Sequence, residues 1–193
     1  MDESKSVIHS EEKNEGKGLQ IASLFFAIPV SSLTYSAIQN QSLGSLFGAV
    51  GFLSVVILLF VMGSFQKKKY NQLGVTPLTL VPSVCTIGTE FSGSIEIGRE
   101  NFNKVNSLSV SSWKYRKVSD SYRFEKVWES TLTPTIKYNK NNTLLEFSFT
   151  IPIGHKPSYK RFFSSNKHHW EISFEFVESM NSIQRRWKIP VQA

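Results

Sequence analysis

Few residues of this chain have the types and spacing that enzyme chemistry requires. Cys85 is the single cysteine among the 193 residues, and the sequence around it lacks the base and electropositive setting that a thiol nucleophile needs. His168 and His169 are adjacent, so in a strand their side chains point to opposite faces and cannot bind one metal ion together. His155 stands apart from both. We therefore predict no metal, no cofactor and no catalytic residue.

The common catalytic motifs are also missing from the sequence. There is no nucleophile elbow, no Walker A loop and no dinucleotide-binding glycine fingerprint. The acidic residues are scattered over predicted strand exteriors, so they form no carboxylate pair of the glycosidase kind. An interaction protein is favoured over an enzyme. The alternative that stays open is a membrane-tethered enzyme of unknown reaction that uses His155, His168 or Cys85.

Positive charge is the distinctive surface property. The chain has a net charge of +7, and residues 71–193 hold 16 Lys and Arg against 10 Asp and Glu. The excess gathers at 113–117, 156–167 and 185–186, and in the first two of these segments basic residues are interleaved with aromatic ones. Such a pattern suits a solvated face, contact with anionic headgroups, a protein partner or nucleic acid, of which nucleic acid is the least favoured. The candidate membrane-surface or partner contacts are Lys67, Lys68, Lys69, Lys160, Arg161, Phe162 and Phe163.

A long uncharged segment precedes the basic part of the chain and is a candidate membrane anchor for it. Residues 18–66 carry no Asp, Glu, Lys or Arg, and they divide into apolar segments at 19–38 and 43–65. Each segment has about the 20 residues that a helix needs to cross a bilayer, which predicts a transmembrane helical hairpin. A buried helix pair in a soluble core is disfavoured, because such helices normally keep a polar face. A cleaved signal peptide is disfavoured by the mixed charges before residue 19 and by the length of the apolar core.

Small residues in the second apolar segment predict where helices pack. Gly44, Gly48 and Gly51 form a stripe that lets a neighbouring helix approach closely. The neighbour could be the first helix or, in a homo-oligomer, a second copy of the chain.

The distribution of lysines predicts the orientation of this hairpin. Lys13 and Lys17 precede the first segment, Lys67 to Lys69 follow the second, and the connecting loop has no basic residue. The positive-inside rule then places both termini in the cytoplasm, with a multi-pass anchor in the inner membrane. The predicted organisation is a disordered tail at 1–18, the hairpin at 19–66, a basic linker at 67–77 and a β domain at 78–193.

Alternating apolar and polar residues after residue 77 predict an all-β domain. In the clearest case, Trp170, Ile172, Phe174 and Phe176 share one face of a strand. About seven antiparallel strands in this length indicate a β-sandwich of two packed antiparallel sheets, immunoglobulin-like in architecture. The expected strands are 78–81, 91–97, 108–118, 122–130, 145–151, 169–178 and 183–191.

Several motifs occur in a characteristic order along the chain. They are LTLVPSVCTIGTEFSGSIEIG at 78–98, VWE at 127–129, FTIP at 149–152, HHWEISFEF at 168–176 and IPV at 189–191. Together with two preceding membrane helices, this order resembles a family of bacterial inner-membrane proteins of unknown function, over about residues 20–193. The segment 158–167 is more basic than the family pattern. The resemblance implies an arrestin-like β-sandwich and a role in interaction or scaffolding at the membrane surface.

Overall fold

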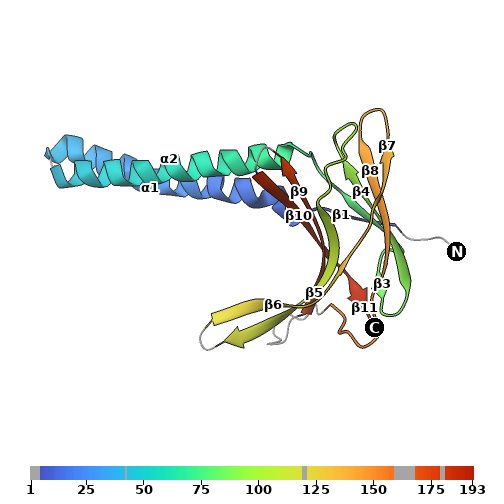
Figure 1. The fold of residues 1–193 in the computed structure, drawn as a ribbon. Helices are drawn as coiled ribbons and strands as arrows, with labels where there is room; N and C mark the ends of the chain where they lie inside the picture. The colour runs from blue at the N-terminus through green and yellow to red at the C-terminus, as the bar shows by residue number, and fades with distance from the viewer. Residues whose placement is uncertain (1–4, 42, 119–120, 159–167, 179–180) are drawn as a thin grey trace. The chain divides into compact units, whose positions relative to one another are not determined.

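The computed structural model describes residues 5–41, 43–118, 121–158, 168–178 and 181–193. It divides into two compact units, a helical unit of Lys13–Gln72 and a β unit that combines the residues up to Glu12 with Leu73–Ala193. The described residues form two α-helices, one short 3-10 helix η1 (Glu11–Asn14) and eleven strands (Figure 1). The eleven strands lie in three sheets, whereas the sequence predicted about seven.

Two long apolar helices form the helical unit. Helix α1 spans Glu15–Asn40 and helix α2 spans Leu43–Asn71, with a left-handed residue, Gln41, at the turn between them. Polar side chains inside the helices satisfy themselves locally. The hydroxyl of Thr34 donates to the carbonyl of Val30 at 2.8 Å, which is how hydroxyl groups are tolerated in apolar surroundings.

Helix α2 continues beyond the predicted end of the hairpin. It includes Lys67, Lys68 and Lys69 and ends at Asn71, so the segment predicted as a basic linker from residue 67 is helical in its first part. Lysine is a good helix former, and cations in the last turn interact favourably with the helix dipole.

The β unit consists of two larger antiparallel sheets and one small parallel pair. Seven of its strands correspond to the seven predicted ones: β2, β4, β5, β6, β8, β9 and β10. The five-stranded sheet has the order β1 (Ser6–Ile8), β2 (Leu78–Val81), β4 (Glu90–Ile97), β8 (Thr143–Thr150) and β7 (Thr135–Tyr138). The four-stranded sheet has the order β10 (Asn181–Ile189), β9 (His168–Glu178), β5 (Ser107–Val118) and β6 (Ser121–Thr131). The parallel pair joins β11 (Val191–Gln192) to β3 (Cys85–Thr86).

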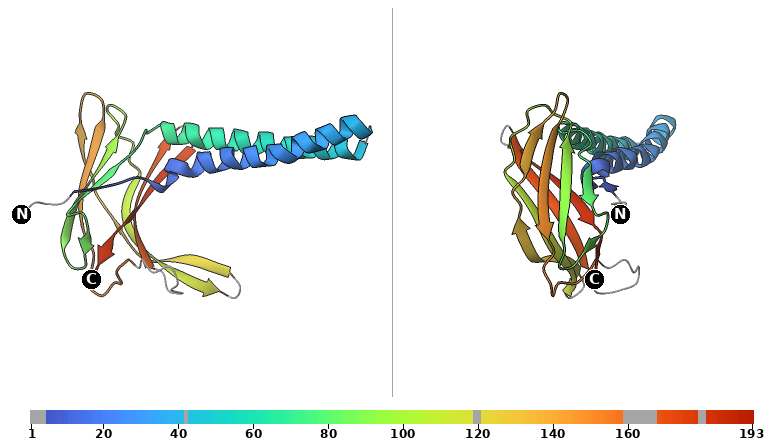
Figure 2. Two further views of the ribbon diagram at one scale, coloured as in Figure 1. Left: turned by 180° about the vertical axis from the view of Figure 1, so that it is seen from behind. Right: turned by 90° about the vertical axis from the view of Figure 1, so that its right-hand side faces the viewer.

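The two larger sheets share one hydrophobic core. Trp170, Ile172 and Phe174 of β9 are fully buried, as the alternating pattern predicted, and they belong to the same cluster as Leu80 and Ile95 of the five-stranded sheet. The right-hand view in Figure 2 looks onto the five-stranded sheet, with strands of the four-stranded sheet behind it. The outer faces of the two larger sheets, turned away from this core, are the surfaces on which a functional site is sought.

The N-terminal segment differs from the disordered tail expected for residues 1–18. Ser6–Ile8 pair with Leu78–Leu80 as strand β1, and Ile8 packs against the core. Helix α1 already begins at Glu15. Composition misses so short a strand, because the backbone of β2 at the sheet edge, rather than a pattern within residues 6–8, supplies its hydrogen bonds.

Candidate functional site

The residues of the enzymatic alternative lie in different surroundings. Cys85 is fully buried in β3, beside Val191 of β11. Burial raises the pKa of the Cys85 thiol to about 12, so the thiol stays protonated near neutral pH and is a poor nucleophile. The His155 ring contacts Trp128 and Trp170, with centroids 5.5 and 5.8 Å apart.

His168 and His169 begin strand β9 and have different neighbours. His168 lies opposite Lys114 and His169 opposite Trp113. Burial lowers the pKa of His168, and nearby lysines lower it further, so its imidazole is neutral near pH 7. Over the described residues, no three His, Cys, Asp or Glu side chains are grouped closely enough to hold a metal ion.

The predicted contact residues fall into two groups. Lys67, Lys68 and Lys69 are exposed on the last turns of α2. Lys160, Arg161, Phe162 and Phe163 lie outside the described residues, so their predicted role stays a prediction.

The predicted glycine stripe is not the close contact between α1 and α2. A Cβ atom added at Gly48 would lie 3.4 Å from a methyl group of Leu33, an ordinary contact, and one added at Gly51 would meet nothing within 4 Å. The close crossing is instead at Gly16 and Gly63, where an added Cβ would lie 2.6 or 2.8 Å from the carbonyl oxygen of the other glycine. Within one chain, therefore, α1 does not approach α2 closely at Gly51, and packing of the stripe on a second copy of the chain stays a prediction.

A sequence signal for this crossing exists but is weak. Gly16 and Gly63 stand at nearly equal chain distances from the turn at Gln41, so a hairpin folded there brings them together. Because Gly16 lay in the predicted disordered tail, no sequence pattern paired it with Gly63.

Two acidic residues before α1 bind the last long strand of the β unit. The Glu12 carboxylate accepts hydrogen bonds from the Arg186 backbone N–H at 3.1 Å and from its Nε at 2.9 Å. Glu11 forms an ion pair with Lys188 at 2.6 Å. We call these four residues the N-terminal clip. The hydrogen bond to the Glu12 carboxylate raises the pKa of Arg186, so the guanidinium stays charged over the physiological range.

Three residues of the clip also belong to a group of aromatic and charged side chains on the face of the four-stranded sheet turned away from the core. The His169 and Trp113 rings are stacked 6.2 Å apart, and the Phe124 ring meets His169 edge-on at 5.0 Å. Lys126 lies over the Trp113 ring at 5.3 Å, a cation–π contact. A small cavity of about 140 Å³ is lined by Glu11, Trp113, Phe124, His169, Glu171, Arg186 and Lys188. We call these seven residues the outer-face cluster.

Electrostatics in the outer-face cluster disfavour charge on its central side chains. Burial, together with the smaller effect of the nearby Lys188 charge, lowers the pKa of His169 to about 4. Burial also raises the pKa of Glu171, whose carboxylate lies 4.0 Å from His169 Nε2. The imidazole is therefore neutral near pH 7, and its contact with Glu171 is not an ion pair.

This neutral imidazole predicts a loss of stability in acid. The unfolded chain protonates His169 as the pH falls through 6.5, whereas the folded chain resists protonation down to about 4, so acidification across that window favours unfolding. We expect a loss of about 2 kcal/mol, reduced from the full linkage value because the ring is partly exposed. Denaturant titration in detergent, followed by tryptophan fluorescence at about pH 7.5 and 4.5, measures it.

His169→Gln is the comparison for that titration. The raised pKa of Glu171 stabilises the folded chain as the pH falls, which opposes the effect of His169, and the variant keeps this contribution. The free energy of unfolding of the wild type should therefore fall by about 2 kcal/mol more than that of the variant between the two pH values. An equal loss in both proteins would show that His169 already titrates normally in the folded chain.

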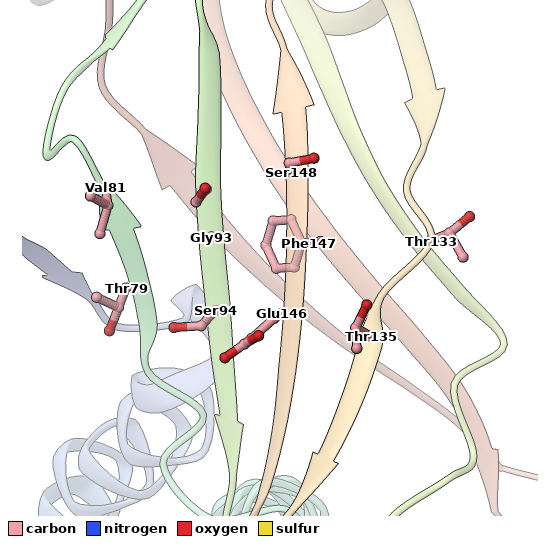
Figure 3. Close-up of a pocket in the computed structure, with 10 residues that line it drawn as sticks. Thr79, Val81, Gly93, Ser94, Thr133, Thr135, Glu146, Phe147 and Ser148 are labelled. Carbon is pink, nitrogen blue, oxygen red and sulfur yellow. The ribbon is translucent and has the colours of Figure 1, made fainter.

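A second hollow, of about 440 Å³, lies on the five-stranded sheet (Figure 3). Small polar side chains line it, among them Thr79, Ser94 and Ser148. Beside them the ring of Phe147 fills the space where Gly93 has no side chain, 2.6 Å from an added Cβ. Glu146 is the charged residue of its lining and is paired with Lys137 at 2.6 Å. The hollow therefore offers hydroxyl groups but no converging charge.

Comparisons with known proteins identify no family. No protein-family model matches the chain, and no curated protein matches it. Among solved structures, it is similar to Spo0M, a sporulation control protein from Bacillus subtilis, with 11% sequence identity and a TM-score of 0.43. The similarity covers 60% of this chain and 48% of Spo0M, so the chain spans about half the length of that protein.

Proposed function

We propose that this chain is a membrane-anchored interaction or scaffold protein of the bacterial inner membrane, with both termini in the cytoplasm. Helices α1 and α2 are long and apolar enough to cross a bilayer, and only 6% and 11% of their most apolar windows are buried. Apolar surface of this extent is costly in water, and lipid would cover it. The resemblance to an inner-membrane family with two spans supports the same proposal.

The observation that carries the topology is that both flanks of the helical hairpin belong to one folded unit. Strand β1 precedes α1 and pairs with β2, which follows α2. Glu12 likewise reaches Arg186. Residues that share a sheet in water must lie on one side of a membrane, so the hairpin crosses twice and its turn at Gln41 emerges on the other side. Cleavage of α1 as a signal would remove β1, which argues against that alternative.

The lysines give this topology its direction. Lys13 and Lys17 precede the apolar part of α1, and Lys67 to Lys69 follow that of α2. Basic residues near membrane ends are retained in the cytoplasm. The β unit is therefore presented to cytoplasmic partners.

Protein interaction suits the surfaces that the β unit offers. Strands β6 and β7 are edge strands of their sheets, and an extended segment of a partner can add to such an edge. The arrestin-like sandwich is part of the same proposal and rests on the resemblance.

Cysteine accessibility in intact cells tests the topology. Gln41→Cys lies at the helical turn, and Ile153→Cys replaces a side chain that is 86% exposed on the β unit. The native Cys85 is fully buried, so the unmodified chain is a low-background control. A membrane-impermeant maleimide should label the Gln41→Cys protein in intact cells, and the Ile153→Cys protein only after permeabilisation.

Two results contradict the proposal. Labelling of Ile153→Cys in intact cells would place the β unit outside the cytoplasm. Labelling of Gln41→Cys and Ile153→Cys from the same side would contradict a hairpin that crosses the membrane. The interaction role is tested separately, by purifying the full chain from native membranes in mild detergent. Recovery without a stoichiometric companion would count against it.

A further inference from the structure

Strands β5 and β6 continue together beyond the rest of their sheet. Over the described residues, which resume at His168, the pairing of β9 with β5 extends to His168 opposite Lys114, whereas β5 and β6 remain paired to Val118 opposite Ser121. Figure 1 shows these ends as a two-stranded projection. A register shift at Ser112 and Trp113 marks its base, where such a bulge bends the strands. We call residues 114–118 and 121–126 the β5–β6 ribbon.

The described side chains of the ribbon are mainly basic. The basic ones are Lys114, Arg116, Arg123 and Lys126, and the ribbon contains one acid among its described side chains, Glu125. Lys126 is paired with Glu129, just outside the ribbon, at 2.8 Å. Arg116 and Glu125 are 3.8 Å apart with side chains 66% and 55% exposed, which is a loose surface pair. The ribbon therefore projects net positive charge into solvent.

Aromatic residues accompany this charge. The rings of Tyr115 and Phe124 lie 4.8 Å apart across the two strands, and Phe124 is 53% exposed. At the base of the ribbon, the Phe124 ring packs edge-on against the His169 ring, with the two centroids 5.0 Å apart. An isolated two-stranded ribbon is only marginally stable in water, so a surface that covers these rings would also stabilise the projection.

We propose that the β5–β6 ribbon binds the headgroup region of an anionic bilayer. Aromatic rings favour the interface between headgroups and acyl chains, and arginine and lysine are attracted to anionic lipids. The inference rests on the proposed membrane anchor, which keeps the ribbon near a lipid surface at high effective concentration. The described ribbon carries charge complementary to that surface, and the anchor makes lipid a more accessible anion than a peptide or a nucleic acid.

Reconstitution of the full chain in nanodiscs tests this proposal. An environment-sensitive dye is attached at Val127→Cys, an exposed site next to the ribbon, and at Tyr138→Cys on β7 as a control of similar exposure, 44% and 52% in the native residues. Acrylamide quenching is compared in phosphatidylcholine discs and in discs containing phosphatidylglycerol. We expect quenching at position 127 to fall about threefold in the anionic discs and to stay unchanged at position 138. High salt should remove the difference.

Charge reversal identifies the groups responsible. Arg116→Glu combined with Arg123→Glu should abolish the protection, since each basic residue near an anionic surface contributes about fivefold to binding. Unchanged tryptophan emission shows that the double variant is folded.

Each other outcome overturns the proposal. Equal quenching at position 127 in both lipids, or protection that survives charge reversal, shows that anionic lipid is not bound by this ribbon. Protection that arises only on adding polyglutamate or an oligonucleotide assigns the ribbon to a different partner. If the chain inserts into neither kind of disc, the proposed membrane anchor is wrong. This outcome is distinguishable from one in which the chain inserts but the ribbon does not bind anionic lipid.

Discussion

Replacing Trp187 by alanine is expected to destabilise the β unit by about 4 kcal/mol. The indole is fully buried in β10, and its Nε1–H donates to the carbonyl of Thr76 at 3.0 Å. The variant leaves a cavity and removes the donor from a buried carbonyl, and truncation of a core tryptophan costs about 3 to 5 kcal/mol. All four tryptophans lie after residue 112, so thermal unfolding followed by tryptophan fluorescence in detergent reports on the β unit.

Two comparison variants make this prediction specific. Trp187→Phe keeps most of the ring and loses the hydrogen bond, so it should cost about 1 to 2 kcal/mol and stay folded if the alanine variant does not. Tyr138→Ala removes a ring that is 52% exposed and should cost less than about 0.5 kcal/mol. A Trp187→Ala protein as stable as Tyr138→Ala would contradict the burial of this indole.

Replacing Gly63 by leucine is expected to separate helices α1 and α2 at their closest approach. A Cβ atom at Gly63 would lie 2.8 Å from the Gly16 carbonyl oxygen and 2.9 Å from Cγ of Gln20. Because one of these neighbours is backbone, the helices themselves must shift, and strain of this kind costs about 1 to 3 kcal/mol.

Crosslinking of Gln20→Cys to Ser64→Cys with a short bifunctional maleimide measures the separation, since Nε2 of Gln20 lies 3.4 Å from Oγ of Ser64 in the native chain. The reagent should link the pair rapidly in the otherwise native chain and several-fold more slowly with Gly63→Leu. Gly51→Leu is the matched control, because nothing lies within 4 Å of a Cβ at that position. Unchanged linking with Gly63→Leu would contradict the close crossing of the two helices at Gly16 and Gly63. Slower linking with Gly51→Leu would show that α1 packs against the predicted stripe.

Elements with their own periodic pattern were predictable from the sequence. The seven strands at 78–191 were each expected close to where the structure has them, since alternation along one strand reports which face is buried. Even Arg185, which breaks the apolar row of β10 in the sequence, is 2% exposed on the core side. Strands β1, β3, β7 and β11 have two to four residues and were missed, because segments of so few residues are too short to show an alternation of apolar and polar side chains.

The candidate site was less predictable than the fold. Glu12 and Arg186 are separated by 174 positions, and nothing local to either residue specifies the other. Both acids of the N-terminal clip stood in a segment that composition alone indicates to be disordered. His169 was considered only as a metal ligand, whereas its role in the structure is to hold Trp113 and Phe124 in place.

The sequence by itself determined the properties that depend on near neighbours in the chain. These are the uncharged helices, the alternating strands, the basic balance and the single cysteine. Tertiary structure alone decided which distant residues meet: β1 with β2, Glu12 with Arg186, and Gly16 with Gly63. Local patterns reflect each residue's own preference for water or apolar surroundings, but a contact between distant residues depends on how the whole chain packs.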